Sequence, residues 1–370
     1  MKKIIFCVIV IFLLTGCSQK SKVQVIQKNE PQFNLKVSKG NEHTKSLSNF
    51  IENKLLKSTG IYTNYKNYAG TANKAGGHEY LSESSGLWLE YLALTDQKQA
   101  FKQTYQNFKK TFDLKEEFSY RYNPKKHQKY GTNATLDDLR IIRALQIYGQ
   151  RQNNNYYRHE AAQRFALLKK HCINHEKIFD FYNVDSHKTS DTSSLTYYDL
   201  LTLKLFEGLQ SSDYQKQLSF VKKGYLGDAF PLYEPAYSWS NESFVNQNLN
   251  TSEAIETLLH LAEVGEIKPE SLQWLRLQID QAKLYNGYSD VGLITDKSQS
   301  AANYAIASLV FSNVKDQAYA KKALRLAYKF QILNHESDLF GAIGLDSHQN
   351  SYAFNDLETL IASQYVESED

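Results

Sequence analysis

The sequence predicts an all-α protein of roughly twelve helices. The first observation is that apolar residues recur every three or four positions, as in Leu87-Tyr91-Leu94 and Leu258-Leu261, which is typical of helices with a buried face. The second is that strand-like alternation is sparse and short. The third is that the helices have similar lengths, short connecting turns and no visible repeat period. This pattern favours a closed arrangement of helical hairpins over a solenoid.

The first helices are bounded by residues that typically start and end helices. Ser82 precedes the second helix, and Thr95 with Asp96 separates it from the third. In chain order, the predicted helices span residues 46–57, 84–95, 98–112, 136–150, 156–173, 195–208, 212–223, 251–264, 269–283, 300–312, 316–333 and 354–364.

The later helices carry similar signals. Thr251 and Ser252 precede a helix that carries Glu253 in its first turn, and Gly265 follows that helix. Pro269 lies in a first turn, where its missing N–H removes no helical hydrogen bond. No proline interrupts a periodic segment, so the twelve spans stand as uninterrupted helices.

The N-terminus has the pattern of a signal peptide. Lysines at positions 2 and 3 precede an apolar run over 4–14, and Thr15 and Gly16 precede Cys17. Eleven apolar residues are too few to cross about 30 Å of hydrocarbon as a helix. The ending resembles the lipobox of bacterial lipoproteins, which implies cleavage before Cys17 and acylation of its sulfur. The alternatives are a plain secretory signal and a tail-less anchor helix.

These observations divide the chain into three parts. We expect a lipoprotein signal peptide over 1–16, a lipidated Cys17 with a flexible tether over 17–43, and a folded domain over 44–370. The domain would then lie outside the cytoplasm, held at the membrane by the lipid. Since Cys7 leaves with the signal peptide and Cys17 takes the lipid, Cys172 is alone and no disulfide is predicted.

Composition excludes several classes of protein. The chain has 370 residues, 42% hydrophobic and 22% charged, which excludes a disordered or collagen-like chain. Its 43 Lys and Arg against 40 Asp and Glu give +3, too near balance for a nucleic-acid binder. No glycine-rich nucleotide-binding motif or serine-hydrolase motif occurs. A neutral or mixed partner is therefore expected.

Two helix starts carry carboxylates suited to chemistry. Glu83 enters a helix beside Trp88, where an aromatic neighbour and exclusion of water would raise its pKa for acid catalysis. The alternative is a first-turn carboxylate that only compensates the helix dipole. Asp137 and Asp138 begin another helix, where they would bind sugar hydroxyls, or cap the helix and pair with nearby arginines such as Arg140.

Together these segments resemble glycoside hydrolase family 8, in particular its exopolysaccharide-degrading lipoproteins of Gram-positive bacteria. The strings LSESSGLWLEYLALTDQ and TNATLDDLRIIRAL carry the resemblance, and NTSEAIETLLHLAEVGEI, KLYNGYSDVGLI, NYAIASLVF and FGAIGLDSHQNSYAFNDLETLIA extend it over roughly 46–364. The resemblance implies an (α/α)6 barrel and an inverting hydrolase of β-linked polysaccharide, without a cofactor. It also implies Glu83 as general acid, with Asp137 and Asp138 at the sugar.

The sequence departs from the family at the general base. The corresponding stretch is FPLYEPAYSWSNESF, where the expected Tyr-Asp step reads Tyr237-Ser238. A serine cannot act as a base near neutral pH without a partner that takes its proton. Glu234 and Glu242 are the candidate replacements. The alternatives are a different register, solvated loop acids, or a protein that has lost hydrolytic rate.

Aromatic residues are candidates for stacking on sugar rings. Tyr197, Tyr198, Tyr237 and Trp239, together with Trp88, are predicted to line the groove, and Tyr233 belongs to the same loop. The alternative for each is a place in the core.

A metal site is not expected. His171 and His175 have helical i, i+4 spacing, but HCINHE lacks the HExxH order and no third ligand is indicated.

The sequence predicts a lipid-anchored monomer, and the family resemblance implies an endo-acting glycosidase of extracellular polysaccharide in the exopolysaccharide or biofilm matrix. Membrane attachment through Cys17 and the polysaccharide substrate are the expected partners, and no nucleic acid is expected. The main alternative is a polysaccharide-binding lipoprotein that has kept the groove and lost the water-activating carboxylate. A helical scaffold without a sugar site would require the aromatic cluster to be buried.

Overall fold

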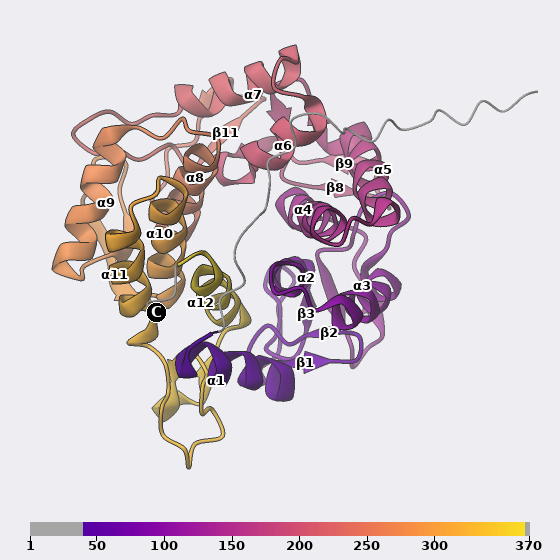
Figure 1. Cartoon of the computed structure of the whole chain (residues 1–370). Helices are drawn as coiled ribbons and strands as arrows, with labels where there is room; N and C mark the ends of the chain where they lie inside the picture. The colour runs from indigo at the N-terminus through magenta and orange to yellow at the C-terminus, as the bar shows by residue number, and fades with distance from the viewer. Residues whose placement is uncertain (1–39, 367–370) are drawn as a thin grey trace, which may run out of the picture.

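Six helices form a closed inner ring, and six others pack around its outside (Figure 1). In the computed structural model, which describes residues 40–366, each inner helix packs against the next and the last packs against the first. The inner helices are α2 (Ser82–Leu94), α4 (Thr135–Arg151), α6 (Leu200–Glu207), α8 (Thr251–Glu263), α10 (Ala301–Asn313) and α12 (Ala353–Tyr365). The outer helices are α1 (Glu42–Phe50), α3 (Lys98–Phe112), α5 (Asn155–Cys172), α7 (Ser212–Lys223), α9 (Pro269–Gln281) and α11 (Gln317–Tyr328). This alternation is an (α/α)6 barrel.

The two rings differ in sequence because they differ in burial. In α10 every residue from Ala301 to Phe311 is buried, so this helix is apolar or small nearly all round. In α3 the buried residues Phe101, Tyr105 and Phe108 recur every three or four positions, and lysines and glutamines lie between them. The core therefore sits between the two rings, and polar groups buried inside the inner ring require partners there.

Short antiparallel strands connect the helices in the described part of the chain. They are β1 (Leu56–Lys57), β2 (Gly60–Ile61), β3 (Tyr80–Leu81), β4 (Arg121–Asn123), β5 (Gln128–Lys129), β6 (Ile173–Asn174), β7 (Lys177–Ile178), β8 (Tyr182–Asn183), β9 (Lys188–Thr189), β10 (Thr192–Ser194), β11 (Ala236–Ser238), β12 (Ser243–Phe244), β13 (Leu249–Asn250), β14 (Tyr285–Tyr288), β15 (Ile294–Gln299), β16 (Gly344–Leu345) and β17 (Asn350–Ser351). Strands β3, β4 and β5 form one sheet, β10 to β12 a second, and β13 to β15 a third. Strand β3 leads directly into α2 and β13 into α8, so these sheets hold the starts of the inner helices.

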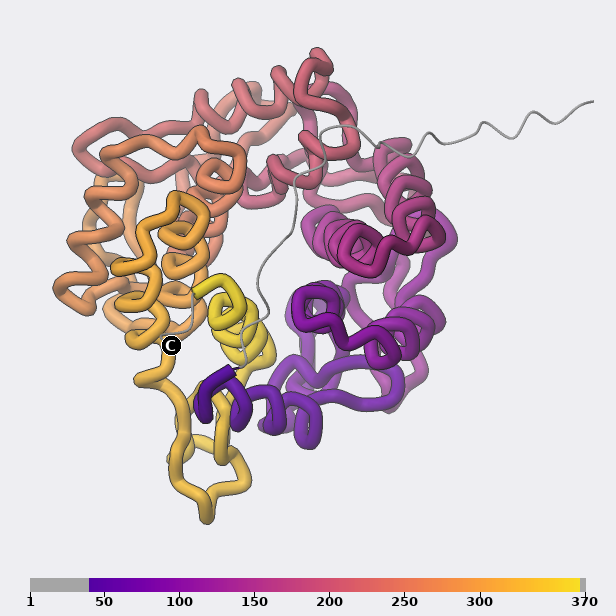
Figure 2. The backbone as a smooth tube through the Cα atoms, in the orientation of Figure 1, coloured from indigo at the N-terminus to yellow at the C-terminus, as the bar shows by residue number. Residues whose placement is uncertain are grey.

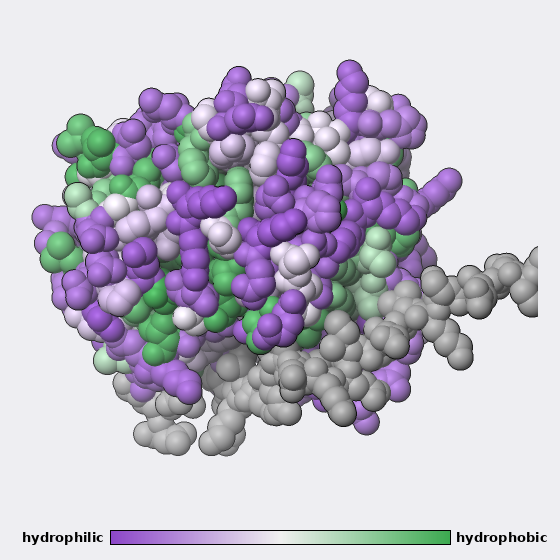
Figure 3. All heavy atoms as spheres, turned by 90° about the horizontal axis from the view of Figure 1, so that it is seen from above, coloured by the Kyte–Doolittle hydropathy of each residue, from purple (hydrophilic) through white to green (hydrophobic). Residues whose placement is uncertain are grey.

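The two ends of the described chain meet. Helix α1 packs against α12, and the tube in Figure 2 follows the chain once around the ring from α1 back to α12. Seen from above, hydrophilic residues cover most of the surface, and hydrophobic residues form separate groups (Figure 3). Among residues 40–366, no helix is long and apolar enough to span a membrane.

Helix boundaries agree closely with the sequence prediction, with three corrections. Helix α1 begins at Glu42, inside the predicted tether, because Asn41 caps it, and a π-helical segment, η1 (Ile51–Leu55), continues it. The predicted helix 195–208 is divided into a 3-10 turn, η2 (Leu195–Tyr197), and α6, since the Asp199 side chain accepts the Thr202 N–H and starts a new helix. The predicted helix 316–333 ends at Tyr328, and a 3-10 turn, η3 (Asp346–His348), precedes β17.

Two cap assignments were wrong. Ser82 is the first residue of α2 rather than its cap, and its hydroxyl instead bonds Asp137. Helix α8 is capped by Asn250, whose side chain accepts the N–H groups of Ser252 and Glu253. The predicted signal peptide and Cys17 lie outside the described residues.

Candidate active site

Glu83 lies in the first turn of the inner helix α2. The hydroxyl of Ser82 donates to Asp137 Oδ2 at 2.8 Å, which ties the start of α2 to the start of α4. The Glu83 side chain is 29% exposed, so it reaches solvent while most of it is enclosed. Burial raises the pKa of Glu83 to about 7, against the opposing charge of Arg140. A glutamate that holds its proton near neutral pH and faces solvent can donate that proton to a bound molecule.

The adjacent aspartates have different roles. Asp137 accepts from Ser82 and from Arg140 Nη1, at 3.2 Å, so it lies beside Glu83. Asp138 points away, because its oxygens accept the backbone N–H of Phe118 and the side-chain amide of Asn133. Successive helical residues lie about 100° apart around the axis, which separates the pair. Asp138 therefore holds a loop, whereas Asp137 lies in the cluster around Glu83.

A third carboxylate, Glu253, faces the same space from the first turn of α8. Its side chain is exposed, and its charge is one of those that raise the pKa of Glu83. The pKa of Glu253 is itself raised, by desolvation and then by the charges of Glu256 and Asp180. Sequence reasoning noted Glu253 only as a helix-start residue. The signal that could have found it is that Glu83, Asp137 and Glu253 all occupy first turns of inner helices.

The two base candidates taken from the sequence lie elsewhere. Glu242 is exposed in the turn between β11 and β12, with φ +51°. Glu234 is half-buried and lines a small pocket that it shares with Glu253 and Thr196. The four charges that act most strongly on Glu83 are those of Arg140, Asp137, Glu256 and Glu253, so neither candidate is among them.

Ser238 has a carboxylate partner that the sequence did not reveal. Its hydroxyl donates to Asp191 Oδ2 at 2.7 Å, and Asp191 also accepts the N–H and hydroxyl of Ser240. These bonds hold the β11–β12 turn against the residue before β10 and lower the pKa of Asp191. Asp191 is therefore an ionised carboxylate that stabilises this turn by accepting its hydrogen bonds.

Arg140 is the cation at the centre of the site. Its Nη2 donates to Glu256 Oε1 at 2.5 Å and its Nη1 to Asp137 Oδ1, while Glu83 Oε2 lies 3.9 Å from Nη1. Thr196 donates to the other oxygen of Glu256 at 3.2 Å. The side chain of Arg140 is only 8% exposed, so its charge acts on these carboxylates with little screening by water.

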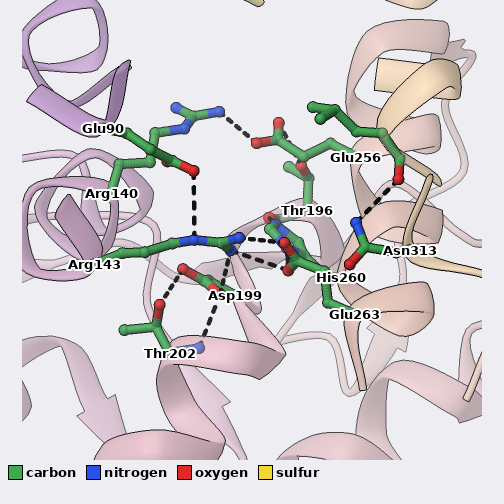
Figure 4. A network of polar contacts seen from close by, with 11 residues as sticks. Glu90, Arg140, Arg143, Thr196, Asp199, Thr202, Glu256, His260, Glu263 and Asn313 are labelled. Atoms are coloured by element: carbon green, nitrogen blue, oxygen red, sulfur yellow. Dashed lines mark hydrogen bonds and ion pairs between the residues drawn. The ribbon is translucent and has the colours of Figure 1, made fainter. Parts of the chain in front are cut away.

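A second ionic cluster fills the interior of the barrel (Figure 4). Arg143, one turn beyond Arg140, makes a bidentate pair with Glu263 and lies 3.5 Å from Asp199 and 3.8 Å from Glu90. Burial would raise the pKa of Glu263, but Arg143 and His260 lower it to about 2. The cavity is lined by five carboxylates, two arginines and a histidine: Glu90, Asp199, Glu256, Glu263, Glu358, Arg140, Arg143 and His260. The ligand atoms of Asp199, His260 and Glu263 lie close enough together to hold a metal ion. In the structure, Arg143 supplies the positive charge beside these groups.

Three of the predicted sugar-binding aromatics belong to the core. Trp88 is 2% exposed and stacks on Tyr91. Tyr198 is fully buried, and its hydroxyl donates to the Glu176 carbonyl at 2.7 Å. Tyr233 is also buried and packs against Tyr225 of the same loop. These rings are enclosed because the inner helices and the loops above them are packed on both sides, so none of the three is available to sugar.

Trp239 and Tyr237 are half-buried, but protein groups engage both rings. Phe220 stacks on Trp239 with centroids 5.1 Å apart, Lys177 lies over the same ring, and Trp239 Nε1 donates to Ser193. Tyr237 meets Phe220 and Trp239 edge-on. The cluster is thus a small core that supports the β10–β11–β12 sheet.

Tyr197 is the predicted aromatic that the structure brings to the carboxylates. It is half-buried in η2, and desolvation raises its pKa well above the usual value, with further effects from Asp137, Asp180 and Glu253. Asp180 accepts the Ser194 N–H at 2.6 Å, which fixes the turn that carries Tyr197. A ring with its hydroxyl beside three carboxylates can bind a sugar by stacking and by hydrogen bonding.

The two histidines of the helical pair contact different carboxylates. His171 Nδ1 lies 2.6 Å from Glu117 and stacks on Tyr182, whereas His175 Nδ1 lies 2.8 Å from Asp213. Their i, i+4 spacing therefore does not create a shared ligand set, because α5 ends at Cys172, before His175.

Comparison with known proteins gives the class to which this fold belongs. No family model matches the chain. "Putative lipoprotein YdaJ" of Bacillus subtilis (strain 168) is 24% identical over 299 residues, which cover 78% of this chain and 80% of that protein. A solved structure described as a novel α-amylase from Clostridium perfringens is 27% identical, with a TM-score of 0.81, over 90% of this chain and 100% of that chain.

More distant structures share the fold and differ in chemistry. Endoglucanase Cel10, a family 8 glycosyl hydrolase from Klebsiella pneumoniae, has a TM-score of 0.59 at 14% identity, over 87% of this chain and all of that chain. A D-mannose isomerase has a TM-score of 0.64 at 14% identity, over 88% and 96%. The chain has the (α/α)6 barrel of family 8 glycoside hydrolases, which confirms the fold implied by the sequence resemblance. Activity must be argued from the site, because one fold carries several chemistries.

Proposed function

We propose that the protein is a glycosidase that hydrolyses polysaccharide by an inverting mechanism, with Glu83 as general acid. The observation that carries the proposal is that Glu83 combines access to solvent with a pKa raised by burial to about 7, in a first turn that Asp137 and Glu253 also face. Glycoside hydrolysis needs one protonated carboxyl group and one carboxylate across the scissile bond.

The proposed reaction uses the three carboxylates in separate roles. Glu83 donates its proton to the glycosidic oxygen as the bond from that oxygen to the anomeric carbon breaks. Glu253 removes a proton from a water molecule, whose oxygen attacks the anomeric carbon from the opposite face. Asp137 accepts hydrogen bonds from the sugar at the scissile position. Inversion requires about 6.5–9.5 Å between acid and base, enough room for that water.

Two substrate classes have support, and a β-linked polysaccharide is the first candidate. The family resemblance supports a β-linked extracellular polysaccharide, cut within the chain, in the exopolysaccharide or biofilm matrix. An α-glucan is the second candidate, since the Clostridium perfringens structure described as an α-amylase shares 27% of its residues with this chain. The roles of acid and base are the same for either linkage, since inversion requires an acid at the leaving oxygen and a base on the opposite face of the anomeric carbon.

Release of reducing ends from a polysaccharide panel tests the proposal. The panel holds carboxymethylcellulose, mixed-linkage β-glucan, amylose and the producing organism's own exopolysaccharide, each with wild type and Glu83→Gln. We expect wild type to cleave one class and Glu83→Gln to lose at least about a hundredfold, the effect of removing a general acid. Binding without cleavage of any member by either protein would contradict the proposal and favour a polysaccharide-binding lipoprotein.

We also propose that a lipid on Cys17 holds the domain at the outer face of the membrane. The lipobox-like ending before Cys17 and the name of the Bacillus subtilis relative support this location. A lipid on Cys17 predicts that Cys17→Ala moves the protein from the membrane fraction to the soluble fraction. Retention of the variant in the membrane fraction would contradict it.

A further inference from the structure

The two terminal nitrogens of Arg140 each donate a hydrogen bond to a carboxylate other than Glu83. Nη2 bonds Glu256 at 2.5 Å and Nη1 bonds Asp137 at 3.2 Å. Glu83 lies 3.9 Å from Nη1, beyond hydrogen-bond distance. The cation nearest to the proposed acid therefore attracts it only through space.

Glu256 is a buried partner of Arg140. It is 8% exposed, and it lies one turn inward from Glu253 on α8. One of its oxygens accepts from Arg140 and the other from the Thr196 hydroxyl. Each oxygen of Glu256 is thus engaged by a protein donor, so we do not assign Glu256 as the residue that activates water.

We propose that Glu256 is a positioning residue that keeps Glu83 protonated by holding Arg140 away from it. This inference rests on the proposed function, in which Glu83 must carry a proton. A guanidinium at hydrogen-bond distance favours the ionised form of a carboxyl group and lowers its pKa by about one to three units. An Arg140 released from Glu256 would turn toward Glu83, and Glu83 would be ionised at neutral pH.

The other charges around Glu83 agree with this role. Three helices bring charged groups to face it: Asp137 and Arg140 from α4, Glu253 and Glu256 from α8, and Glu358 from α12. Arg140 is the one cation in this set of described groups, so its position decides how strongly ionisation of Glu83 is favoured. Glu256 acts in two ways, through its bond to Arg140 and through its own negative charge.

Titration of Glu83 in the Glu256→Gln variant tests the inference without any substrate. The purified protein, labelled with carbon-13 at the glutamate carboxyl groups, is followed by NMR from pH 4 to 9, and Glu83→Gln assigns the signal. We expect the pKa of Glu83 to fall from about 7 by at least about one unit in Glu256→Gln. Wherever wild type hydrolyses a polysaccharide, the alkaline limb of kcat/KM falls by the same amount.

Glu90→Gln is the matched control. Glu90 is a buried glutamate on α2 that pairs with Arg143 instead of Arg140, so its substitution should leave the Glu83 signal within about 0.3 units. If Glu256→Gln does not fold, Glu256→Asp keeps the charge and shortens the reach to Arg140, and a smaller downward shift is expected. An unchanged or raised pKa of Glu83 in a folded Glu256 variant would overturn the inference. A downward shift in a protein that cleaves nothing would instead overturn the proposed function.

Discussion

Two arginines one turn apart on α4 create opposite environments. Arg140 and Arg143 are both buried, and each lies near three carboxylates. Beside Arg143 the pKa of Glu263 is lowered to about 2, whereas beside Arg140 the pKa of Glu83 is raised to about 7. The difference lies in how each guanidinium distributes its hydrogen bonds.

Arg143 gives both terminal nitrogens to Glu263, a bidentate arrangement that stabilises the ionised carboxylate. Arg140 divides its terminal nitrogens between Glu256 and Asp137, and Glu83 receives neither. Proximity to an arginine therefore does not decide whether a buried glutamate is ionised. The difference is that Glu263 receives both terminal nitrogens of its arginine whereas Glu83 receives none, which distinguishes a structural ion pair from the proposed proton donor.

The largest effect is expected at the carboxylate that faces Glu83 across the site. Glu253→Gln should reduce hydrolysis at least about a hundredfold, because the water would lose its proton acceptor. Glu234→Gln is the control, since Glu234 lines the neighbouring pocket but is not among the strongest charges on Glu83. Rates of reducing-end release measure both. Full loss in Glu234→Gln with an active Glu253→Gln would reverse the assignment of the base.

Removing Glu263, the glutamate bonded to Arg143, should lower the stability of the fold. Glu263→Gln leaves the buried Arg143 without its bidentate partner, and we expect the free energy of unfolding to fall by about 3 kcal/mol. Denaturant unfolding followed by circular dichroism measures it. Glu83→Gln, which removes a carboxylate without a hydrogen bond to an arginine, should leave stability unchanged or raise it slightly. Equal losses of unfolding free energy in Glu263→Gln and Glu83→Gln would contradict the proposed difference between the two arginine environments.

Asp356 extends the comparison to a buried carboxylate held only by neutral groups. Burial raises its pKa to about 7, against hydrogen bonds from Ser351 and the Ile343 N–H. The folded state therefore binds this proton more tightly than the unfolded state, and the stabilisation is full below about pH 4 and is lost as pH rises toward 7.

Asp356→Asn removes this titration while keeping an oxygen for Ile343, and the Ser351 hydroxyl can donate to the Ile343 carbonyl instead. We expect the variant to be more stable than wild type at pH 8 by on the order of 2 kcal/mol, and no more stable at pH 4. Thermal unfolding at the two pH values measures the difference. A gain of the same size at pH 4 would show that the effect is not protonation.

The smallest effects are expected for the aromatic residues Trp239 and Tyr197, which lie in different environments. Trp239→Phe loses the bond from Nε1 to Ser193 and should lower stability by about 1 kcal/mol with an unchanged KM. Tyr197→Phe should instead raise KM several-fold and leave stability nearly unchanged, because its hydroxyl faces the carboxylates. A raised KM in Trp239→Phe would restore Trp239 as a sugar-binding residue.

Helix positions were predictable because apolar spacing and end signals are local. The prediction placed α3 and α7 at the bounds that the structure has, and it failed at residues 195–208, where a single side-chain cap at Asp199 divides the helix. Local sequence also placed Glu83, Asp137 and Asp138 in first turns of helices, where the structure has them.

The remaining site depended on contacts between distant segments. Glu253 is 170 residues from Glu83 in sequence, and only ring closure brings their helix starts together. The surroundings of Trp239 could not be predicted, because a loop with two prolines gives no sign that Phe220 and Lys177 contact its ring. The choice between Asp137 and Asp138 likewise required contacts with other segments, Ser82 of α2 for Asp137 and Phe118 for Asp138.

The assignment of Glu83 as general acid is tested most directly by titrating Glu83 and Glu263 in one sample of wild-type protein. Carboxyl signals labelled with carbon-13 report both groups, and the Gln variants assign them. We expect Glu83 to titrate at about pH 7 and Glu263 to stay ionised down to about pH 2. If Glu83 titrated near the ordinary glutamate value of about 4.3, it would carry no proton at neutral pH, and its assignment as general acid would be contradicted.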